Sequence, residues 1–279
     1  MRFSLGCRLA YQVAAPTPFL FNVEAAGFGQ QRILSERLTI AGDPPYETYT
    51  QPETSNRLVR LIAQPGALTL SYDAEVELDA YVAEPASVDA IPAEQLPFAV
   101  LPHLNPSRFC PSDKLAAFAH AEFDGPESGH ERVARICNWI YERTKYRPGS
   151  SDAMTSAIDT MIDRAGVCRD FAHLGVTLCR ALGIPARFVS CYAWQLDPPD
   201  FHAVFEAYLG GRWYLFDPTR QASLDGLVRI GCGRDAADVS FATIHGQVEP
   251  TDMQVRIRAH DEKATLDHRT AMAVSTSAE

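Results

Sequence analysis

Two long stretches of strict alternation constrain the first third of the chain more than any other feature. Apolar side chains occupy every second position from Phe3 to Val13 and again from Leu68 to Leu78. A period of two is typical of strands that bury one face. The apolar runs between them are short and separated by glycine and proline, at residues 19–23, 33–40, 46–50 and 58–63. The pattern predicts an antiparallel β domain, either a sandwich or a barrel.

The spacing of apolar residues changes after a segment rich in proline. Residues 84–111 hold six prolines, and we interpret them as a linker. Beyond it, Val133, Ile136 and Ile140 recur at three and four residues, as on one face of a helix. The expected elements are helices at about 112–123 and 127–145, a helix from Cys168, and strands at about 187–194, 202–209 and 212–217.

These elements predict an α+β protein with two main domains. We expect a β-rich N-terminal domain at residues 1–105, an α+β core at 106–246, and a C-terminal strand and tail at 247–279. From about Glu262 the composition is typical of a tail rather than of a packed element.

Cys168 falls in the first turn of an amphipathic helix that Gly183 and Pro185 end. The apolar stripe of this helix consists of Cys168, Phe171, Gly175, Leu178 and Leu182. Free N–H groups and the positive end of the helix dipole favour a thiolate at its start. Taken alone, the position also fits an ordinary core cysteine. The segment that follows decides between the two interpretations.

Residues 201–219 predict a β-hairpin that carries a histidine and an aspartate. A two-residue turn at Gly210-Gly211 is favoured, because glycine tolerates the positive φ angles of such turns. Glu206 then faces Leu215, and side chains two residues apart share a face. His202 and Asp217 become diagonal neighbours on one face, within reach of an imidazole–carboxylate contact.

A cysteine at a helix start, a histidine and an aspartate are the parts of a thiol nucleophile with an oriented base. We expect Cys168 to be the nucleophile and His202 the general base. Asp217 would accept a hydrogen bond from the imidazole and hold its tautomer. The arrangement predicts acyl transfer through a thioester.

Three residues next to Cys168 are expected to have other roles. Asp170 and His173 point away from Cys168 on a helix, so they cannot serve as its base. We expect them to fix the helix in the core through hydrogen bonds or a buried charge pair. Arg169 is expected to do the same, or to shape the entrance of the site.

Backbone N–H groups at the start of this helix are placed to stabilise the oxyanion of a tetrahedral intermediate. A second donor is usual at such sites. The segment before the helix offers Tyr146, Ser150 and Ser151 as candidates.

With these residues in place, the chain resembles the transglutaminase-like superfamily, which includes bacterial transglutaminase-like cysteine proteases. The resemblance rests on residues 166–173 (Gly-Val-Cys-Arg-Asp-Phe-Ala-His), residues 182–187, and the segments around His202 and Asp217, and it covers roughly residues 110–245. It implies a papain-like, transglutaminase-like α+β catalytic core with Cys168, His202 and Asp217 as the triad. The N-terminal stretch is similar to the β-rich domain that precedes this core in bacterial members.

Composition argues against several classes of function. A net charge of −10 and a pI near 5.3 argue against nucleic acid as a partner. No run approaches the roughly 18 apolar residues of a membrane helix, so no membrane partner is expected. Seven cysteines without CxxC spacing argue for reduced thiols and against a structural zinc site, and no metal or other cofactor is expected. The N-terminus alternates instead of forming a signal-peptide core, so we expect a cytoplasmic protein.

Three functions stay open at this point, because fold alone does not choose among them. The first is hydrolysis of a peptide or isopeptide through a thioester on Cys168, the second is transglutaminase-type transfer to an amine, and the third is a catalytically silent binding module. An intact set of cysteine, histidine and aspartate argues against the third. We favour hydrolysis of a peptide or protein amide, because a cross-linking enzyme among lysine-rich cytosolic partners would act indiscriminately.

Overall fold

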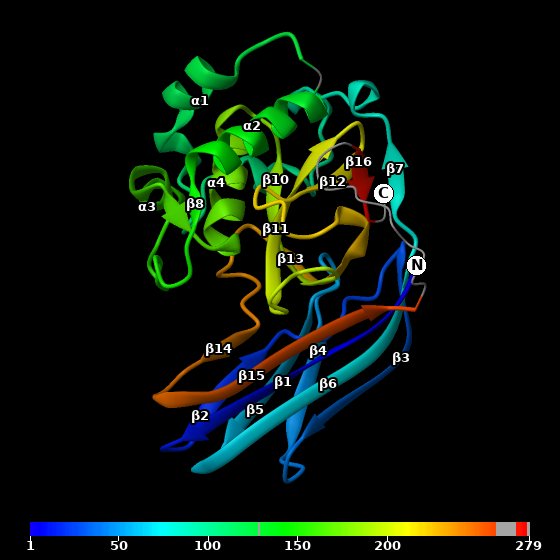
Figure 1. The fold of residues 1–279 in the computed structure, drawn as a ribbon, viewed down its shortest axis with the longest axis vertical. Helices are drawn as coiled ribbons and strands as arrows, with labels where there is room; N and C mark the ends of the chain where they lie inside the picture. The colour runs from blue at the N-terminus through cyan, green and yellow to red at the C-terminus, as the bar shows by residue number, and fades with distance from the viewer. Residues whose placement is uncertain (128, 261–271, 278–279) are drawn as a thin grey trace.

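The computed structural model describes residues 1–127, 129–260 and 272–277, and its chain forms two lobes (Figure 1). One lobe consists of β-strands, drawn in the lower half of the figure. The other lobe holds helices α1–α4 against a four-stranded β-sheet of its own. The fold is therefore α+β, with an N-terminal antiparallel β domain followed by an α+β core, as the sequence predicts.

The N-terminal lobe is a sandwich of two four-stranded sheets, with strand orders β15-β1-β6-β3 and β14-β2-β5-β4. Alternating side chains from both sheets, among them Phe3, Phe21 and Tyr72, form its buried core. Its strands are β1 (Arg2–Val13), β2 (Thr17–Phe21), β3 (Gln31–Ile40), β4 (Tyr46–Thr50), β5 (Arg57–Ala63), β6 (Gly66–Leu78), β14 (Ala242–Ile244) and β15 (Val248–Ala259).

Two of these strands come from the far end of the chain. Strand β14 pairs with β2, and β15 pairs with β1 along nearly its whole length. The expected C-terminal strand is thus β15, and it belongs to the N-terminal sandwich. Of the expected tail, residues 261–271 lie outside the described residues. Residues 273–277 differ from the expectation, because they are buried and include β16 (Ala273–Ser275), which pairs with β7 (Tyr81–Ala83).

The core lobe is built on an antiparallel sheet of order β12-β11-β10-β13, with helix α4 packed on one face. The expected helices and the three expected strands are present, whereas α3 and β13 were not expected. The elements of this lobe and of the linker are η1 (Pro85–Ser87), η2 (Ala93–Gln95), η3 (Leu101–Leu104), η4 (Ser112–Lys114), α1 (Ala116–Phe123), α2 (Gly129–Arg143), β8 (Lys145–Tyr146), α3 (Ala157–Asp163), β9 (Ala165–Gly166), α4 (Cys168–Ala181), β10 (Ala186–Ala193), β11 (Phe201–Leu209), β12 (Arg212–Phe216), η5 (Leu224–Gly226) and β13 (Leu227–Gly233).

The β11–β12 hairpin has the predicted register. Gly210 and Gly211 form the turn with φ angles of +54° and +88°, which only glycine adopts without strain. Glu206 lies opposite Leu215, as expected from a two-residue turn. The face that carries His202 therefore also carries the side chain at position 217.

A buried charge cluster lies in the middle of β11. The Glu206 carboxylate accepts hydrogen bonds from the guanidinium groups of Arg187 and Arg229 and from the Ser277 hydroxyl. Burial would raise the pKa of Glu206, but the two arginines lower it to about 2. The cluster ties β11 to β10, to β13 and to the buried C-terminal segment.

Amide side chains of the N-terminal lobe hydrogen-bond to the outer edge of β13 and join the two lobes. Gln31 donates from Nε2 to the Arg229 carbonyl at 2.8 Å and accepts the Arg229 N–H at 2.8 Å. Asn56 makes the same pair of bonds with Cys232, at 2.9 and 2.8 Å. Each amide side chain thus makes the two hydrogen bonds that a residue of a neighbouring strand would make. The backbone groups of Arg229 and Cys232 at this sheet edge are therefore satisfied.

We expect Gln31→Ala to destabilise the protein by about 1–3 kcal/mol, because it leaves the buried Arg229 N–H without its acceptor, while the Arg229 carbonyl keeps the Ala26 N–H at 3.0 Å. Denaturant unfolding would measure the change. Gln12→Ala, at an exposed position of β1, is the matched control and should change the free energy of unfolding by less than about 0.5 kcal/mol. Equal effects of the two substitutions would contradict this account of the lobe interface.

Candidate active site

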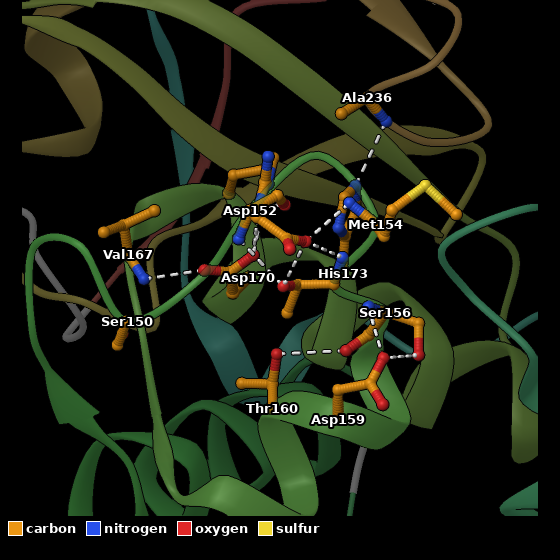
Figure 2. A network of polar contacts seen from close by, with 12 residues as sticks. Ser150, Asp152, Met154, Ser156, Asp159, Thr160, Val167, Asp170, His173 and Ala236 are labelled. Atoms are coloured by element: carbon orange, nitrogen blue, oxygen red, sulfur yellow. Dashed lines mark hydrogen bonds and ion pairs between the residues drawn. The ribbon is translucent and has the colours of Figure 1, made fainter.

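Helix α4 begins at Cys168, and its first turn is held by Asp170 (Figure 2). The Asp170 carboxylate accepts the N–H of Val167 at 2.8 Å, and the Asp170 N–H donates to the Val167 carbonyl at 2.9 Å. Gly166 is required here, since a Cβ at this position would lie 2.7 Å from the Cβ of Asp170. These contacts fix the backbone on which the Cys168 thiol is carried.

A second glycine sets how closely α4 approaches the sheet. A Cβ at Gly175 would lie 2.3 Å from the Phe205 ring of β11, so no larger residue fits without moving the helix. The glycine costs helix propensity, and the close approach explains why it is present. Helix α4 and β11 are thereby held together, one carrying Cys168 and the other His202.

His202 and Asp217 lie together in the interior, each only 2% exposed. His202 Nε2 donates to Asp217 Oδ2 at 2.9 Å. The other carboxylate oxygen, Oδ1, accepts the Thr219 N–H at 2.9 Å and the Thr219 hydroxyl at 2.7 Å. Three donors therefore fix the Asp217 carboxylate, and the carboxylate in turn fixes the imidazole ring.

Their surroundings keep both groups charged. Burial would lower the pKa of His202, but the charge and hydrogen bond of Asp217, with a contribution from Cys168, raise it to about 10. Burial would raise the pKa of Asp217, but His202 and the bonds from Thr219 hold it below its usual value. At neutral pH the pair is an imidazolium and a carboxylate.

The Cys168 side chain lies near the His202 imidazole. Among the described residues, His202 Nδ1 has no hydrogen-bond partner that meets strict geometry. The Cys168 side chain is nevertheless close enough to His202 to raise its pKa. Nε2 is held by Asp217, and Nδ1 is the ring nitrogen that the described residues leave open.

Of the three candidates for a second oxyanion donor, the structure brings Tyr146 to Cys168. Parallel pairing of β8 with β9 sets Tyr146 beside Gly166, just before α4. The Tyr146 hydroxyl interacts with both the backbone N–H and the side chain of Cys168. Burial and the charge of Cys168 raise the pKa of Tyr146, so its hydroxyl keeps its proton.

Ser150 and Ser151 lie in a different place. The Ser150 hydroxyl donates to the Arg147 carbonyl at 2.7 Å. Both serines line an open groove of about 480 Å³ over the loop before α3, together with Asp152, Met154, Asp159 and Asp163. Neither serine is placed at the thiol by a contact of this kind, so Tyr146 is the candidate that the geometry supports.

The residues next to Cys168 act on the scaffold, in agreement with the expectation from the helix. Arg169 donates to the Asp170 carboxylate at 3.0 Å and to the Asp152 carbonyl at 2.6 Å. His173 is fully buried, and its Nε2 accepts the Ala236 N–H at 3.1 Å (Figure 2). Burial lowers the pKa of His173 to about 3, so it is a neutral acceptor rather than a base.

The cysteines differ sharply in exposure. All seven are free thiols, and Cys168 is partly exposed while the other six are buried. Burial raises the pKa of Cys7 to about 11 and of Cys110 to about 12, and it raises those of Cys137, Cys179 and Cys191 as well. Cys168 is thus the thiol that is open to solvent.

No group of three or more histidine, cysteine, aspartate or glutamate side chains in the described part of the chain is arranged to hold a metal ion. Within the same residues, no helix combines the length and the apolar character needed to cross a bilayer.

The sequence analysis assigned no role to two residues at or beside the site, Thr219 and Asp200. Thr219 supports Asp217, and an aspartate followed two residues later by threonine is a signal for such a turn. Asp200 lies beside the site, and its charge acts on both His202 and Tyr146. An aspartate after two prolines reads as an ordinary loop residue, so the sequence held no signal for this position.

Comparison with known proteins agrees with this geometry. A model of the transglutaminase-like superfamily matches residues 117–218, and a model of the bacterial transglutaminase N-terminal domain matches residues 1–99. A crystal structure from Cytophaga hutchinsonii, described as a candidate cysteine protease, is 43% identical with a TM-score of 0.94. The match covers 99% of this chain and 97% of that one.

Curated relatives are more distant. An uncharacterized protein of Mycobacterium leprae is 30% identical over 162 residues, which is 54% of this chain and 58% of the relative. An uncharacterized protein of Mycobacterium tuberculosis is 30% identical over 151 residues, 49% of this chain and 48% of the relative. The chain thus spans about half the length of these curated relatives. Matches across both lobes, with a 43% identical structure over almost the whole length, show that the chain belongs to the transglutaminase-like superfamily.

Proposed function

We propose that this protein hydrolyses a peptide or isopeptide bond through a thioester on Cys168. The observation that carries the proposal is the buried His202–Asp217 pair, with its free ring nitrogen beside a thiol at a helix start. A histidine that is buried only for packing would not need a charged partner. A cysteine that only fills space in the core would not be partly exposed. Together the three residues support nucleophilic catalysis by an activated thiol.

In the first half-reaction, the Cys168 thiolate, paired with the His202 imidazolium, attacks the amide carbonyl and a C–S bond forms. The oxygen becomes an oxyanion, which the Cys168 N–H and the Tyr146 hydroxyl stabilise. The C–N bond then breaks as the His202 imidazolium gives its proton to the leaving amine. A neutral imidazole and an acyl-thioester remain.

In the second half-reaction, His202 takes a proton from water as the water oxygen attacks the thioester. Collapse of this second intermediate releases the acid and returns the thiolate beside an imidazolium. Throughout both steps Asp217 keeps its negative charge and stabilises the imidazolium, since its pKa is held below its usual value.

The test supplies an acyl donor, either a Gln-containing peptide or an activated ester, with and without millimolar methylamine. We expect intact-protein mass spectrometry to find the acyl group on Cys168, and we expect free acid to exceed the amine-coupled product. Coupling in preference to hydrolysis would require a site that binds and orients the amine, and that result would replace hydrolysis by amine transfer. If the acyl group is found on another residue, or on no residue of the wild-type protein, both hydrolysis and amine transfer through Cys168 are wrong.

Cys168 should be the most reactive of the seven thiols, because it is partly exposed and the others are buried. Brief treatment of the folded protein with iodoacetamide, followed by peptide mapping, should find most of the label on Cys168. The unfolded protein is the control, where all seven thiols should react alike. Preferential labelling of a buried cysteine in the folded protein would contradict the assignment.

Asp217→Asn should lower turnover by about a hundredfold or more while leaving the fold intact, because the amide no longer holds the imidazole tautomer. It should also lower the pKa of His202, since the Asp217 charge is what raises it, and the alkaline limb of the kcat/KM profile should move to lower pH.

Asp113→Asn, at an exposed position in η4, is the control for this carboxylate-to-amide change and should leave both turnover and profile unaltered. If Asp217→Asn keeps an activity within about threefold of the wild type, Asp217 only shapes the turn and does not act in catalysis. A threefold change corresponds to less than about 1 kcal/mol in the activation free energy.

A further inference from the structure

Arg220 links the turn that carries Asp217 to helix α2. It is the fourth residue of the turn that follows β12, and its N–H donates to the Asp217 carbonyl at 3.2 Å. Its guanidinium donates from Nη2 to Asn138 Oδ1 at 2.5 Å, and its Cζ lies 4.2 Å from the centre of the Tyr141 ring. Asn138 and Tyr141 are three residues apart on α2, so they are neighbours on its surface and hold the same side chain.

Hydrogen bonds inside the turn fix the Asp217 carboxylate relative to its own backbone. Asp217 Oδ1 accepts both the N–H and the hydroxyl of Thr219, and the turn closes on the Asp217 carbonyl. These bonds move together with the turn, so they do not hold the turn against the rest of the lobe. Arg220 makes such a connection, because its side chain leaves the turn and binds a helix.

Side-chain packing between the turn and α2 is incomplete. Asn138 of α2 and Asp217 of the turn line the same small cavity. A cavity removes contacts that would otherwise hold the facing surfaces in place. The Arg220 contacts therefore span a part of the lobe where packing alone leaves the turn less constrained.

The backbone of Arg220 makes an arginine an unexpected residue at this position. Its φ angle is +55°, in the left-handed region that favours glycine and is unfavourable for a residue with a Cβ. Glycine would suit the turn better if the backbone alone mattered. The contacts with α2 are what an arginine adds.

Helix α2 also packs against the helix that carries the thiol. Ile136 of α2 and Phe171 of α4 belong to one buried cluster. Arg220 therefore connects the turn of Asp217 to the same layer of helices from which Cys168 extends.

We propose that Arg220 is a positioning residue of the candidate site, which anchors the Asp217 turn to helix α2 and so holds the carboxylate at His202. This inference rests on the proposed function only where it concerns turnover, because the anchor acts on the His202–Asp217 pair before any substrate binds. Without the anchor, the carboxylate can move away from the imidazole, and the 2.9 Å bond that stabilises the imidazolium weakens.

The first experiment needs no substrate and measures the pKa of His202 by NMR of histidine-labelled protein. Asn138→Ala removes the acceptor of the Arg220 bond at an exposed helix position, where alanine is favourable, and it changes no charge. We expect it to lower the pKa of His202 by about half a unit, because the Asp217 carboxylate is what raises that pKa. Arg220→Gly should lower it further.

The direction of the shift separates positioning from a simple charge effect. Loss of the Arg220 positive charge would by itself raise the pKa of a nearby imidazolium. A fall in the pKa of His202 therefore reports movement of the Asp217 carboxylate.

Arg164→Gly is the matched control for Arg220→Gly. Arg164 likewise has a positive φ angle, +53°, and its guanidinium lies over an aromatic ring of α2, that of Trp139, but it is outside the Asp217 turn. Its replacement should leave the pKa of His202 unchanged. An unchanged or raised pKa in Asn138→Ala or Arg220→Gly, or an equal fall in Arg164→Gly, would overturn the proposal. If Arg220→Gly does not fold, Asn138→Ala decides, since it leaves the turn itself intact.

The second experiment measures kcat and KM of the same variants with an acyl donor that the wild type hydrolyses. We expect Asn138→Ala to lower kcat by about three- to tenfold at unchanged KM, because the anchor orients the base and leaves substrate binding alone. An unchanged kcat would overturn the role of Arg220 in turnover. If the wild type hydrolyses no donor while the pKa of His202 still falls in the variants, the proposed hydrolysis is wrong and the anchor stands.

Discussion

The close contact between helix α4 and strand β11 fixes the spacing on which the candidate site depends. Gly175 lets the helix lie directly on the Phe205 ring, and the same two elements carry Cys168 and His202. A thiol and an imidazole from distant parts of the sequence meet because their backbones pack at this distance. Asp170 at the helix start then removes the remaining freedom of the thiol's own turn.

Much of this arrangement could be predicted because it follows from local rules. Alternation over Phe3–Val13 and Leu68–Leu78 identified two strands that pair with each other in the sandwich. The Gly210-Gly211 turn determined the hairpin register, and the register placed His202 and Asp217 on one face. In each case a residue's conformation depends on neighbours that are close in sequence, which is the information a single chain displays.

The parts that could not be predicted depend on partners far away in sequence. Strand β13 was not predicted because Arg229 interrupts its apolar run. The buried Arg229 guanidinium is stabilised by its hydrogen bonds to Glu206 and Ser277, which lie far away in the sequence. The buried β16 lies in a stretch whose composition is that of a tail. Tyr146 reaches Cys168 through a two-residue parallel pairing that leaves no pattern in the sequence.

The buried Glu206 cluster on β11 ties the neighbouring strands and the C-terminal segment together. It therefore limits which positions of the strand can change in sequence during evolution. A substitution at Glu206 disturbs several elements at once, so evolutionary change there is strongly restricted. Asp200, directly before the same strand, is exposed, and within the described residues its carboxylate accepts a hydrogen bond from the next residue's N–H alone, so it can vary at small cost. Sequence change along β11 is therefore expected at its entrance, while its interior stays constant.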